Sequence, residues 1–226
     1  MKLLAIDTSG EACSAALWLD GQVEQVLEIA PRRHGELILG MMQAVLDRAG
    51  LGLAGLDAIA FGRGPGSFTG VRIAVAVAQG AAFGAGLPLV PVSTLAAIAQ
   101  GQHRRAGSRR LLVALDARMD EVYWGCYGID ANGLAVACGE ERVCPPGEVE
   151  WPGGADWIGV GPGWTSYGEA LRARTGLAPS DCIGEVVCEA RDLAQLATAE
   201  LAAGRQVPPE RAMPVYLRDR VTRVVG

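Results

Sequence analysis

The spacing of apolar residues changes from a strand pattern to a helical pattern within the first fifty residues, and this change restricts the possible folds most strongly. Three short apolar or alternating segments predict strands, over 3–6, Ala12–Leu19 and Gln22–Ile29. Asp20-Gly21 predicts the hairpin turn between the last two. Over His34–Ala49 the apolar residues recur at helical spacing, and Gly50 ends the pattern. A strand meander followed by a helix favours an α/β fold.

Strands and helices continue to alternate through the rest of the first half. The predicted elements are a strand over Asp57–Phe61, a helix from the N-cap Ser67 to about Phe83, a strand over Leu89–Val92 and a helix from Thr94 to about Gln100. The element order is therefore βββαβαβα. The polar, arginine-rich stretch His103–Arg110 predicts a linker.

The pattern starts again after this stretch. The predicted elements are strands over Leu111–Leu115 and Glu121–Tyr127, a weaker strand within Leu134–Val143, a loop over Pro145–Pro152, a strand over Trp157–Val160, and helices over Tyr167–Arg174 and Asp192–Ala203. Both halves open with an apolar strand that ends in aspartate, Asp7 and Asp116. We therefore expect a duplicated βββαβαβα unit with a degraded second copy. The predicted domains are an N-terminal lobe over 1–103 and a C-terminal lobe over 104–226, whose last helix packs back on the first lobe.

Composition excludes several classes of protein. Lys2 is the only lysine among 20 basic residues, whereas P-loop NTPases, protein kinases and Schiff-base enzymes need an interior lysine. His34 and His103 are the only histidines and lie too far apart for a His-x-x-x-His metal pair. The formal net charge of −5 is unfavourable for binding nucleic acid through phosphate neutralisation alone.

The cysteines and the hydropathy predict a cytoplasmic protein that does not span a membrane. None of the six cysteines forms a C-x-x-C pair, and we expect them to be reduced, small core residues. Ile73–His103 carries no Asp, Glu, Lys or Arg, which is long enough for a membrane span. Glycine and proline interrupt it, however, so a buried helix, a turn and a buried strand are the preferred interpretation.

Two turns at strand ends are candidate anion or metal sites. In Gly62-Arg-Gly-Pro-Gly-Ser67, a predicted strand is followed by glycines at 62, 64 and 66 and then by the start of a predicted helix. The free N–H groups at this helix start can bind phosphate or carboxylate, with Arg63 and Arg72 nearby. The alternative is a tight turn with close packing of strand and helix. Asp7-Thr8-Ser9 can hold hydrated magnesium or contact phosphate, or can make only local backbone bonds. The candidate nucleotide-cleft residues are Asp7, Thr8, Ser9, Gly64, Gly66 and Ser67.

The predicted helix from Ser67 to about Phe83 is apolar nearly all round, so both of its sides need cover. One side can take the sheet, and the other needs either a partner or the second half of the chain. The candidate partner-interface residues are Leu37, Ile38, Met41, Met42, Val45, Ala74 and Ala78. The arginines at 104, 105, 109 and 110 are expected to be solvated, with contact to RNA phosphate as the alternative.

Several stretches together resemble the bacterial TsaB (YeaZ) family. They are Ile6-Asp-Thr-Ser-Gly-Glu-Ala-Cys-Ser14, His34-Gly-Glu36, Gly62-Arg-Gly-Pro-Gly-Ser-Phe-Thr-Gly-Val-Arg72, Val92-Ser-Thr-Leu95, Asp116-Ala-Arg118, Glu121-Val-Tyr123 and Pro214-Val-Tyr-Leu-Arg218. The resemblance implies the two-lobed actin-like, sugar-kinase superfamily fold. It also implies a role in making threonylcarbamoyl-adenosine in tRNA, as the non-catalytic relative of the transferase TsaD.

The resemblance further implies how such a chain acts. It would pair with TsaD through the N-lobe helices, form homodimers in isolation over a similar surface, have TsaE as a third partner, and meet tRNA only through the complex. TsaD carries a metal-binding histidine pair, whereas here His34 stands alone with Ile38 four residues on. Asp116-Ala117-Arg118 departs from the glycine-containing second phosphate turn of the superfamily, which implies weak binding of ATP or ADP with magnesium, or none.

The predicted function is therefore that of an accessory dimerisation subunit that binds and activates TsaD, with no cofactor and no catalytic residues of its own. The alternative is a stand-alone ATPase or small-molecule phosphotransferase of the same superfamily, in which Asp7 positions magnesium-bound nucleotide.

Overall fold

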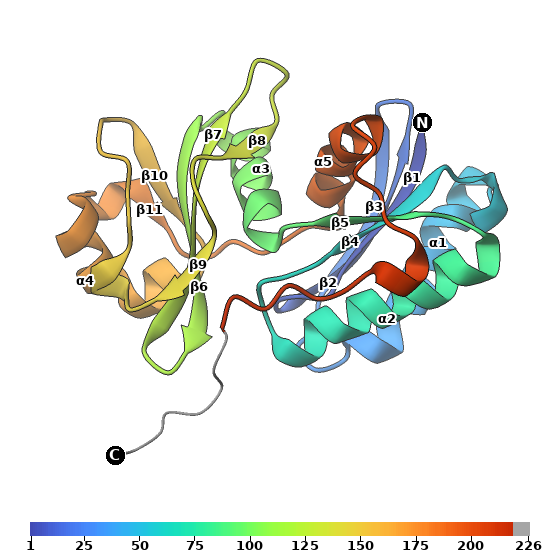
Figure 1. Cartoon of the computed structure of the whole chain (residues 1–226), viewed down its shortest axis with the longest axis horizontal. Coiled ribbons are helices and arrows are strands. Elements are labelled where there is room, and N and C mark those ends of the chain that lie inside the picture. Colours follow the sequence, from blue (N-terminus) through green and yellow to red (C-terminus); the bar gives the residue numbers. More distant parts are fainter. Residues whose placement is uncertain (219–226) are drawn as a thin grey trace.

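The computed structural model describes residues 1–218, which form two β-sheets with helices between and around them (Figure 1). The strands are β1 (Lys2–Asp7), β2 (Ala12–Leu19), β3 (Gln22–Ile29), β4 (Ala58–Gly62), β5 (Leu89–Val92), β6 (Arg110–Arg118), β7 (Glu121–Ile129), β8 (Ala135–Ala137), β9 (Arg142–Cys144), β10 (Trp157–Val160) and β11 (Cys182–Ile183). The α-helices are α1 (His34–Ala49), α2 (Phe68–Ala85), α3 (Thr94–Ala106), α4 (Gly163–Thr175) and α5 (Ala190–Ala202).

The first sheet has the strand order β3-β2-β1-β4-β5, with β1 antiparallel to β2 and parallel to β4. Side chains alternate along β1, as the pleat requires. Leu4 and Ile6 belong to the hydrophobic cluster that includes buried residues of α1 and α2, whereas Leu3 and Ala5 belong to the cluster that includes buried residues of α5. We call this sheet with α1, α2 and α5 the N-lobe.

The second sheet has the order β11-β10-β6-β7-β8, and β9 also pairs with β7. Leu112 and Trp124 on one face pack with Trp164 of α4, and the indole N–H of Trp164 donates to the carbonyl oxygen of Leu112 at 2.9 Å. Leu111 and Val113 point to the other face and pack with α3. We call this sheet with α3 and α4 the C-lobe.

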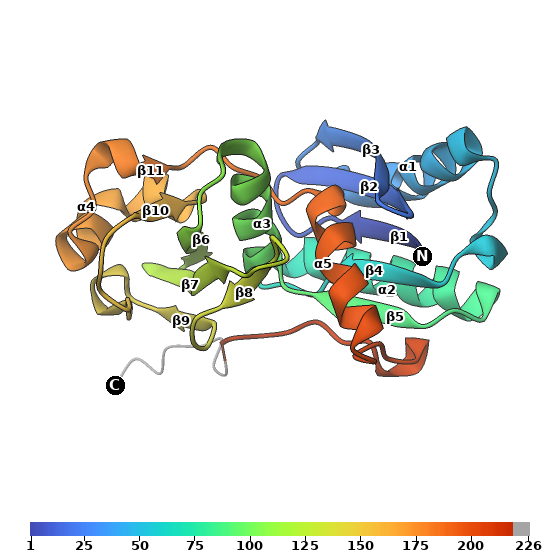
Figure 2. The same ribbon diagram turned by 90° about the horizontal axis from the view of Figure 1, so that it is seen from above.

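Helices α3 and α5 lie side by side between the two sheets (Figure 2). Helix α3 contacts β6, β7 and β8, and α5 contacts β1, β2, β4 and β5. Their buried residues join the facing sides of both sheets in one continuous core. Helix α5 is thus the last α-helix within residues 1–218, and it packs on the sheet formed by the first half.

The element order of the first half confirms the sequence prediction. The order from β1 to α3 is βββαβαβα, and a short 3-10 turn precedes β4. Ser67 caps α2, because its hydroxyl oxygen accepts a hydrogen bond from the N–H of Gly70 at 3.3 Å. Gly50 ends α1 in the left-handed conformation, with φ of 62°.

The predicted linker over His103–Arg110 is wrong in its first part. Helix α3 continues to Ala106 and ends at Gly107, so the expected domain boundary after 103 falls inside a helix. The prediction failed because polar residues are not by themselves a sign of a linker. Arg104 and Arg105 instead lie on a partly exposed edge of α3, where they pair with Glu189 and Asp192 at the start of α5. The weaker strand predicted within Leu134–Val143 is two short strands, β8 and β9.

The second half runs β6-β7-β8-β9-β10-α4-β11-α5. Where α1 follows β3 in the first half, this half has β9 and a 3-10 turn in place of a helix. Helix α4 begins at Gly163, earlier than predicted, and its backbone departs from helical geometry at Tyr167. The internal duplication stays a prediction.

Helices α1 and α2 cover the face of the first sheet that points away from α5 (Figure 1). Helix α2 is long and apolar enough, by length and composition alone, to cross a membrane. Only 33% of this helix is buried, on the face that packs against β4, so the expected buried helix is exposed on its other side. Among residues 1–218, the extensive contacts of α1 and α2 are with elements of the N-lobe and the 3-10 turn Pro209–Arg211, and not with the second sheet or its helices.

Candidate functional site

The turn after β1 is packed against the start of α2. Asp7, Thr8 and Ser9 are buried. The hydroxyl of Thr8 donates to the carbonyl oxygen of Gly70 at 2.6 Å, and the N–H of Ser67 donates to the carbonyl oxygen of Ser9 at 2.8 Å. The N–H and hydroxyl of Ser9 both donate to the carboxylate of Asp7 at 3.1 Å. The structure therefore brings this turn and the glycine-rich loop together, as predicted, but through contacts with each other.

Glycine is required in this loop by the close approach of the chain's own backbone. A Cβ atom at Gly66 would overlap the carbonyl oxygen of Ser9, and one at Gly70 would overlap that of Thr8. Gly64 has φ of +96°, and its carbonyl oxygen accepts a hydrogen bond from the N–H of Thr94 at 3.1 Å. These contacts favour the tight-turn interpretation over an open cradle for an anion.

Asp7 is an unusual carboxyl group because it is fully buried at the end of β1. Its Oδ1 atom has no hydrogen-bond partner among the described residues. Burial raises the pKa of Asp7 to about 6, and the hydrogen bonds from Ser9 oppose this shift. The folded protein therefore holds a proton on Asp7 at pH values where an unfolded chain would have lost it.

This shift predicts a pH dependence of stability that the Asp7→Asn variant lacks. Between about pH 4 and pH 6 the folded state binds more protons at Asp7 than the unfolded state, so this group lowers the free energy of unfolding as pH rises. A pKa shift from 3.8 to about 6 changes the contribution of Asp7 to the free energy of unfolding by roughly 3 kcal/mol. Urea unfolding of both proteins from pH 4 to pH 7 measures the difference. As pH rises over this range, we expect the free energy of unfolding of the variant to increase by about 3 kcal/mol relative to that of wild type. If the free energies of unfolding of the two proteins change in parallel with pH, the raised pKa of Asp7 is refuted.

The corresponding turn of the C-lobe is held by its own residues. The carboxylate of Asp116 accepts hydrogen bonds from the N–H of Arg118 at 2.7 Å and from the hydroxyl of Tyr167 at 3.3 Å. Arg118, Met119 and Asp120 all have positive φ, between 57° and 61°. Three successive non-glycine residues in this region mark a strained hairpin.

His34, the candidate remnant of a metal pair, lies buried at the start of α1. Ile38, one turn further on, points into the core. No group of three or more potential metal-ligating side chains is found within residues 1–218.

The apolar stripe predicted as a partner surface faces the N-lobe core, which corrects that expectation. The buried members of the stripe are Ile38, Met41, Met42, Val45, Ala74 and Ala78, and Leu37 is half-buried. The most regular apolar stripe of a helix is the one that faces its own sheet. Other residues of the two helices are exposed, notably Leu39 (61% exposed) and Phe83 (80% exposed).

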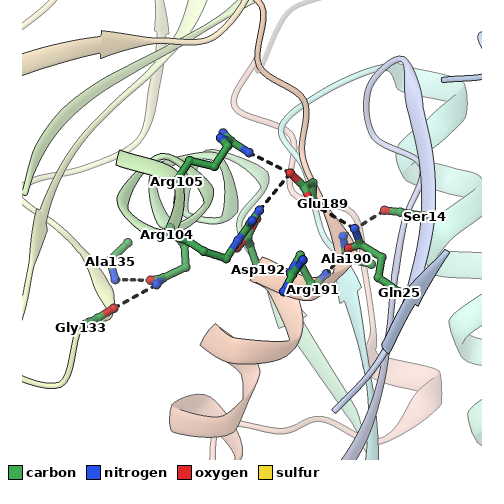
Figure 3. Close-up of polar contacts among 11 residues, drawn as sticks. Ser14, Gln25, Arg104, Arg105, Gly133, Ala135, Glu189, Ala190, Arg191 and Asp192 are labelled. Atoms are coloured by element: carbon green, nitrogen blue, oxygen red, sulfur yellow. Dashed lines mark hydrogen bonds and ion pairs between the residues drawn. The ribbon is translucent and has the colours of Figure 1, made fainter. Parts of the chain in front are cut away.

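The four arginines of the cluster form two different sets of contacts, and Figure 3 shows those of Arg104 and Arg105. Arg104 binds Asp192 through Nε–Oδ1 and Nη2–Oδ2 contacts of 2.8 and 3.0 Å. Arg104 and Arg105 also contact Glu189, at 3.0 and 2.8 Å. These two arginines are therefore not simply solvated, because they join α3 to the start of α5 while staying partly exposed, and contact with RNA phosphate stays a prediction. Arg109 and Arg110 donate to backbone carbonyl oxygens.

One polar residue that the sequence analysis did not single out also joins the lobes. Glu141, in the loop between β8 and β9, accepts hydrogen bonds from the hydroxyl of Ser93, which caps α3, and from that of Tyr127. Arg63 of the glycine-rich loop lies 3.8 Å from the same carboxylate. No local sequence signal marks Glu141, because all three partners are distant in the chain.

Comparison with known proteins places this two-lobed architecture in a family. Residues 26–156 match the family model described as "TsaD: tRNA N6-adenosine threonylcarbamoyltransferase". The "tRNA threonylcarbamoyladenosine biosynthesis protein TsaB" of Escherichia coli is 46% identical over 98% of this chain and 96% of its own length. The protein of the same name from Haemophilus influenzae is 38% identical over 98% of this chain and 95% of its own length.

A solved structure agrees with these relatives. "YeaZ from Pseudomonas aeruginosa" is 47% identical in sequence, superposes with a TM-score of 0.89, and covers 96% of this chain and 99% of its own. This similarity, together with the two sheets described above, confirms the predicted two-lobed α/β fold. The chain belongs to the TsaB (YeaZ) family.

Proposed function

We propose that this chain is the non-catalytic dimerisation subunit of a tRNA threonylcarbamoyladenosine biosynthesis complex, and that it binds and activates a TsaD-type protein. The observation that carries the proposal is the outer surface of α2, which is apolar apart from Arg72, together with the exposed Leu39 of α1. No C-lobe element within residues 1–218 packs extensively on this surface. Family membership supplies the pathway, since the TsaB relatives are named for it.

The outer surface of α1 and α2 has the composition of a helix-docking face. Leu39 and Phe83 are exposed, and Ile73 and Val77 are only half-buried. Arg72 is the only charged residue in α2. Glycines at 40, 80 and 84 have open space where a side chain would be, so a partner helix can approach the backbone closely. Exposed apolar surface of this kind marks interaction sites in globular proteins.

The same structure supports a non-catalytic role. The hydroxyl of Thr8 and the N–H of Ser67, two groups that could have held a phosphate at this turn, already bond to carbonyl oxygens of the chain itself. These contacts therefore do not favour the stand-alone ATPase alternative. Neither magnesium nor nucleotide is needed to complete these contacts.

The remaining partners follow from the same role. The chain would form homodimers over the α1–α2 surface when TsaD is absent, and would join TsaE within the complex. It would act in the cytoplasm and meet tRNA only through the complex. The acidic net charge and the pairing of Arg104 and Arg105 with acidic side chains agree with indirect contact to tRNA.

Charge introduced on the outer surface tests the proposal. We expect Leu39→Glu and Phe83→Glu each to weaken association with a TsaD-type protein by about 100-fold or more, because an unpaired carboxylate would be buried at the interface. Both side chains are exposed in this chain, so both variants should fold. Titration calorimetry measures the affinity.

The matched control is Val136→Glu, at an apolar residue that is 52% exposed on β8 of the C-lobe. We expect this variant to bind like wild type. Unchanged affinity in both helix variants would remove the proposed interface.

A further inference from the structure

Cys126 on β7 and Cys138, the residue after β8, lie directly opposite each other on neighbouring antiparallel strands. The pairing of β7 with β8 places Tyr127 opposite Ala137. A backbone hydrogen bond of 2.7 Å from the N–H of Cys138 to the carbonyl oxygen of Cys126 extends this register by one residue. Directly opposite residues project from the same face of a sheet. The two thiols are therefore cross-strand neighbours.

The spacing of such neighbours suits a disulfide. Directly opposite residues of an antiparallel pair have Cα atoms about 4.5 or 5.5 Å apart, and disulfides span about 4.4–6.8 Å. A Cβ atom at Gly128, two residues after Cys126, would lie 3.4 Å from the sulfur of Cys138. The sulfur of Cys138 thus lies over the row of β7 residues to which Cys126 belongs. A side-chain rotation brings the two sulfur atoms together without a change of register.

The two cysteines are thiols in this structure, and each sulfur contacts a carbonyl oxygen. That of Cys126 lies 3.5 Å from the oxygen of Glu150, and that of Cys138 lies 3.9 Å from the oxygen of Val136. Cys138 is exposed and Cys126 is half-buried. This corrects the expectation that all six cysteines are small core residues.

We propose that Cys126 and Cys138 form a reversible disulfide, with a low-molecular-weight disulfide such as oxidised glutathione as the oxidant. The exposed thiolate of Cys138 attacks one sulfur of the oxidant, the S–S bond of the oxidant breaks, and one thiolate leaves. Cys126 then attacks the sulfur of Cys138, the protein disulfide forms, and the second thiolate leaves. The two protein thiols lose two electrons and two protons, which convert the oxidant into two thiols.

The order of these steps follows from the surroundings of the two sulfurs. Burial, together with smaller contributions from negative charge on Cys138 and Glu150, raises the pKa of Cys126 to about 11. Cys126 is therefore a poor first nucleophile, and the accessible Cys138 reacts first. In the mixed disulfide Cys138 carries no charge, which removes one of the causes that keep Cys126 protonated.

The other cysteines have no comparable neighbour. Cys13 and Cys188 are buried in the clusters that pack on the first sheet. Cys182 lies on β11, with β10 and β6 between it and β7. Cys144 pairs with Val122, four residues from Cys126 along β7, which is about 13 Å in an extended strand.

The disulfide would act on the loop that joins the lobes. Cys138 begins the segment that leads to Glu141, whose carboxylate meets Ser93 at the start of α3 and Tyr127 on β7. A bond between Cys126 and Cys138 fixes the start of this segment to the sheet. Disulfides in reducing compartments are usually transient and regulatory, as a reversible bond at this position would be.

Oxidised glutathione added to the full chain tests the proposal. After incubation, alkylation and digestion without reductant, mass spectrometry should find the peptides of Cys126 and Cys138 linked. A thiol titration should fall from six to four, and dithiothreitol should restore it.

Three variants make the test specific. Cys126→Ser should retain glutathione on Cys138, because the second attack is lost, and Cys138→Ser should give no linked peptide. Cys182→Ser, at a half-buried cysteine of the same sheet, should form the bond like wild type. Wild-type protein that keeps glutathione on Cys138 without forming the link, or that links other cysteines, would overturn the proposal. Circular dichroism confirms that each variant is folded.

Discussion

Replacing Arg104 with alanine is expected to lower the free energy of unfolding by about 3–5 kcal/mol, the usual cost of leaving a buried charge without its partner. The side chain of Asp192 is only 1% exposed, and Arg104 supplies two hydrogen bonds to it. Without Arg104, this carboxylate keeps its full desolvation cost. The pair also joins α3 to α5, the two helices whose buried residues contribute to the core that connects the two lobes (Figures 2 and 3).

Urea unfolding at neutral pH measures this effect. Arg205→Ala is the matched control, because Arg205 makes the same two-bond contact with Glu200 on the exposed surface, where we expect little change. The double variant Arg104→Ala/Asp192→Ala should recover part of the loss, since it removes the unpaired carboxylate. A loss for Arg104→Ala no larger than that of the control would show that the pair does not hold the lobes together.

The pH dependence of the Arg104 variant gives a second check. Burial raises the pKa of Asp192 even in the presence of Arg104, which opposes the shift. Loss of the guanidinium should raise that pKa further. Protonation of Asp192 in mild acid then removes the buried charge, so the deficit of the variant relative to wild type should shrink as pH falls.

The first half of the fold was predictable because its elements are specified locally. The period of apolar residues in Ala12–Leu19 and His34–Ala49, and the cap at Ser67, depend on neighbours within a few positions. The end of α3 was not predictable in this way. Its partners Glu189 and Asp192 lie more than 80 residues further along the chain, and without them Arg104 and Arg105 have the composition of a linker.

In the glycine-rich loop, too, some features are set by neighbouring residues and others by residues far away in the sequence. The strand, turn and helix around Gly62–Ser67 could be predicted from composition. Composition could not predict whether those glycines make room for a ligand or for the protein's own backbone. The answer depends on Thr8 and Ser9, which lie about 60 residues earlier in the chain. The structure favours the protein's own backbone.

The helix surfaces show the limit of periodicity itself. A regular apolar stripe identifies a buried face but not what buries it. The stripe containing Met41 and Val45 packs on the chain's own sheet. The surface left for a partner is less regular, contains glycine and alanine, and is marked by Leu39 and Phe83.

Reconstitution of tRNA modification tests the central proposal most directly. Purified TsaD-type and TsaE-type proteins, tRNA and the substrates of the reaction are combined with and without this chain, and threonylcarbamoyl-adenosine is measured in the tRNA. We expect modification only when the chain is present, none from the chain alone, and none above background when Leu39→Glu or Phe83→Glu replaces it. Equal modification without the chain, or modification by the chain alone, would contradict its assignment as a non-catalytic subunit that activates its partner.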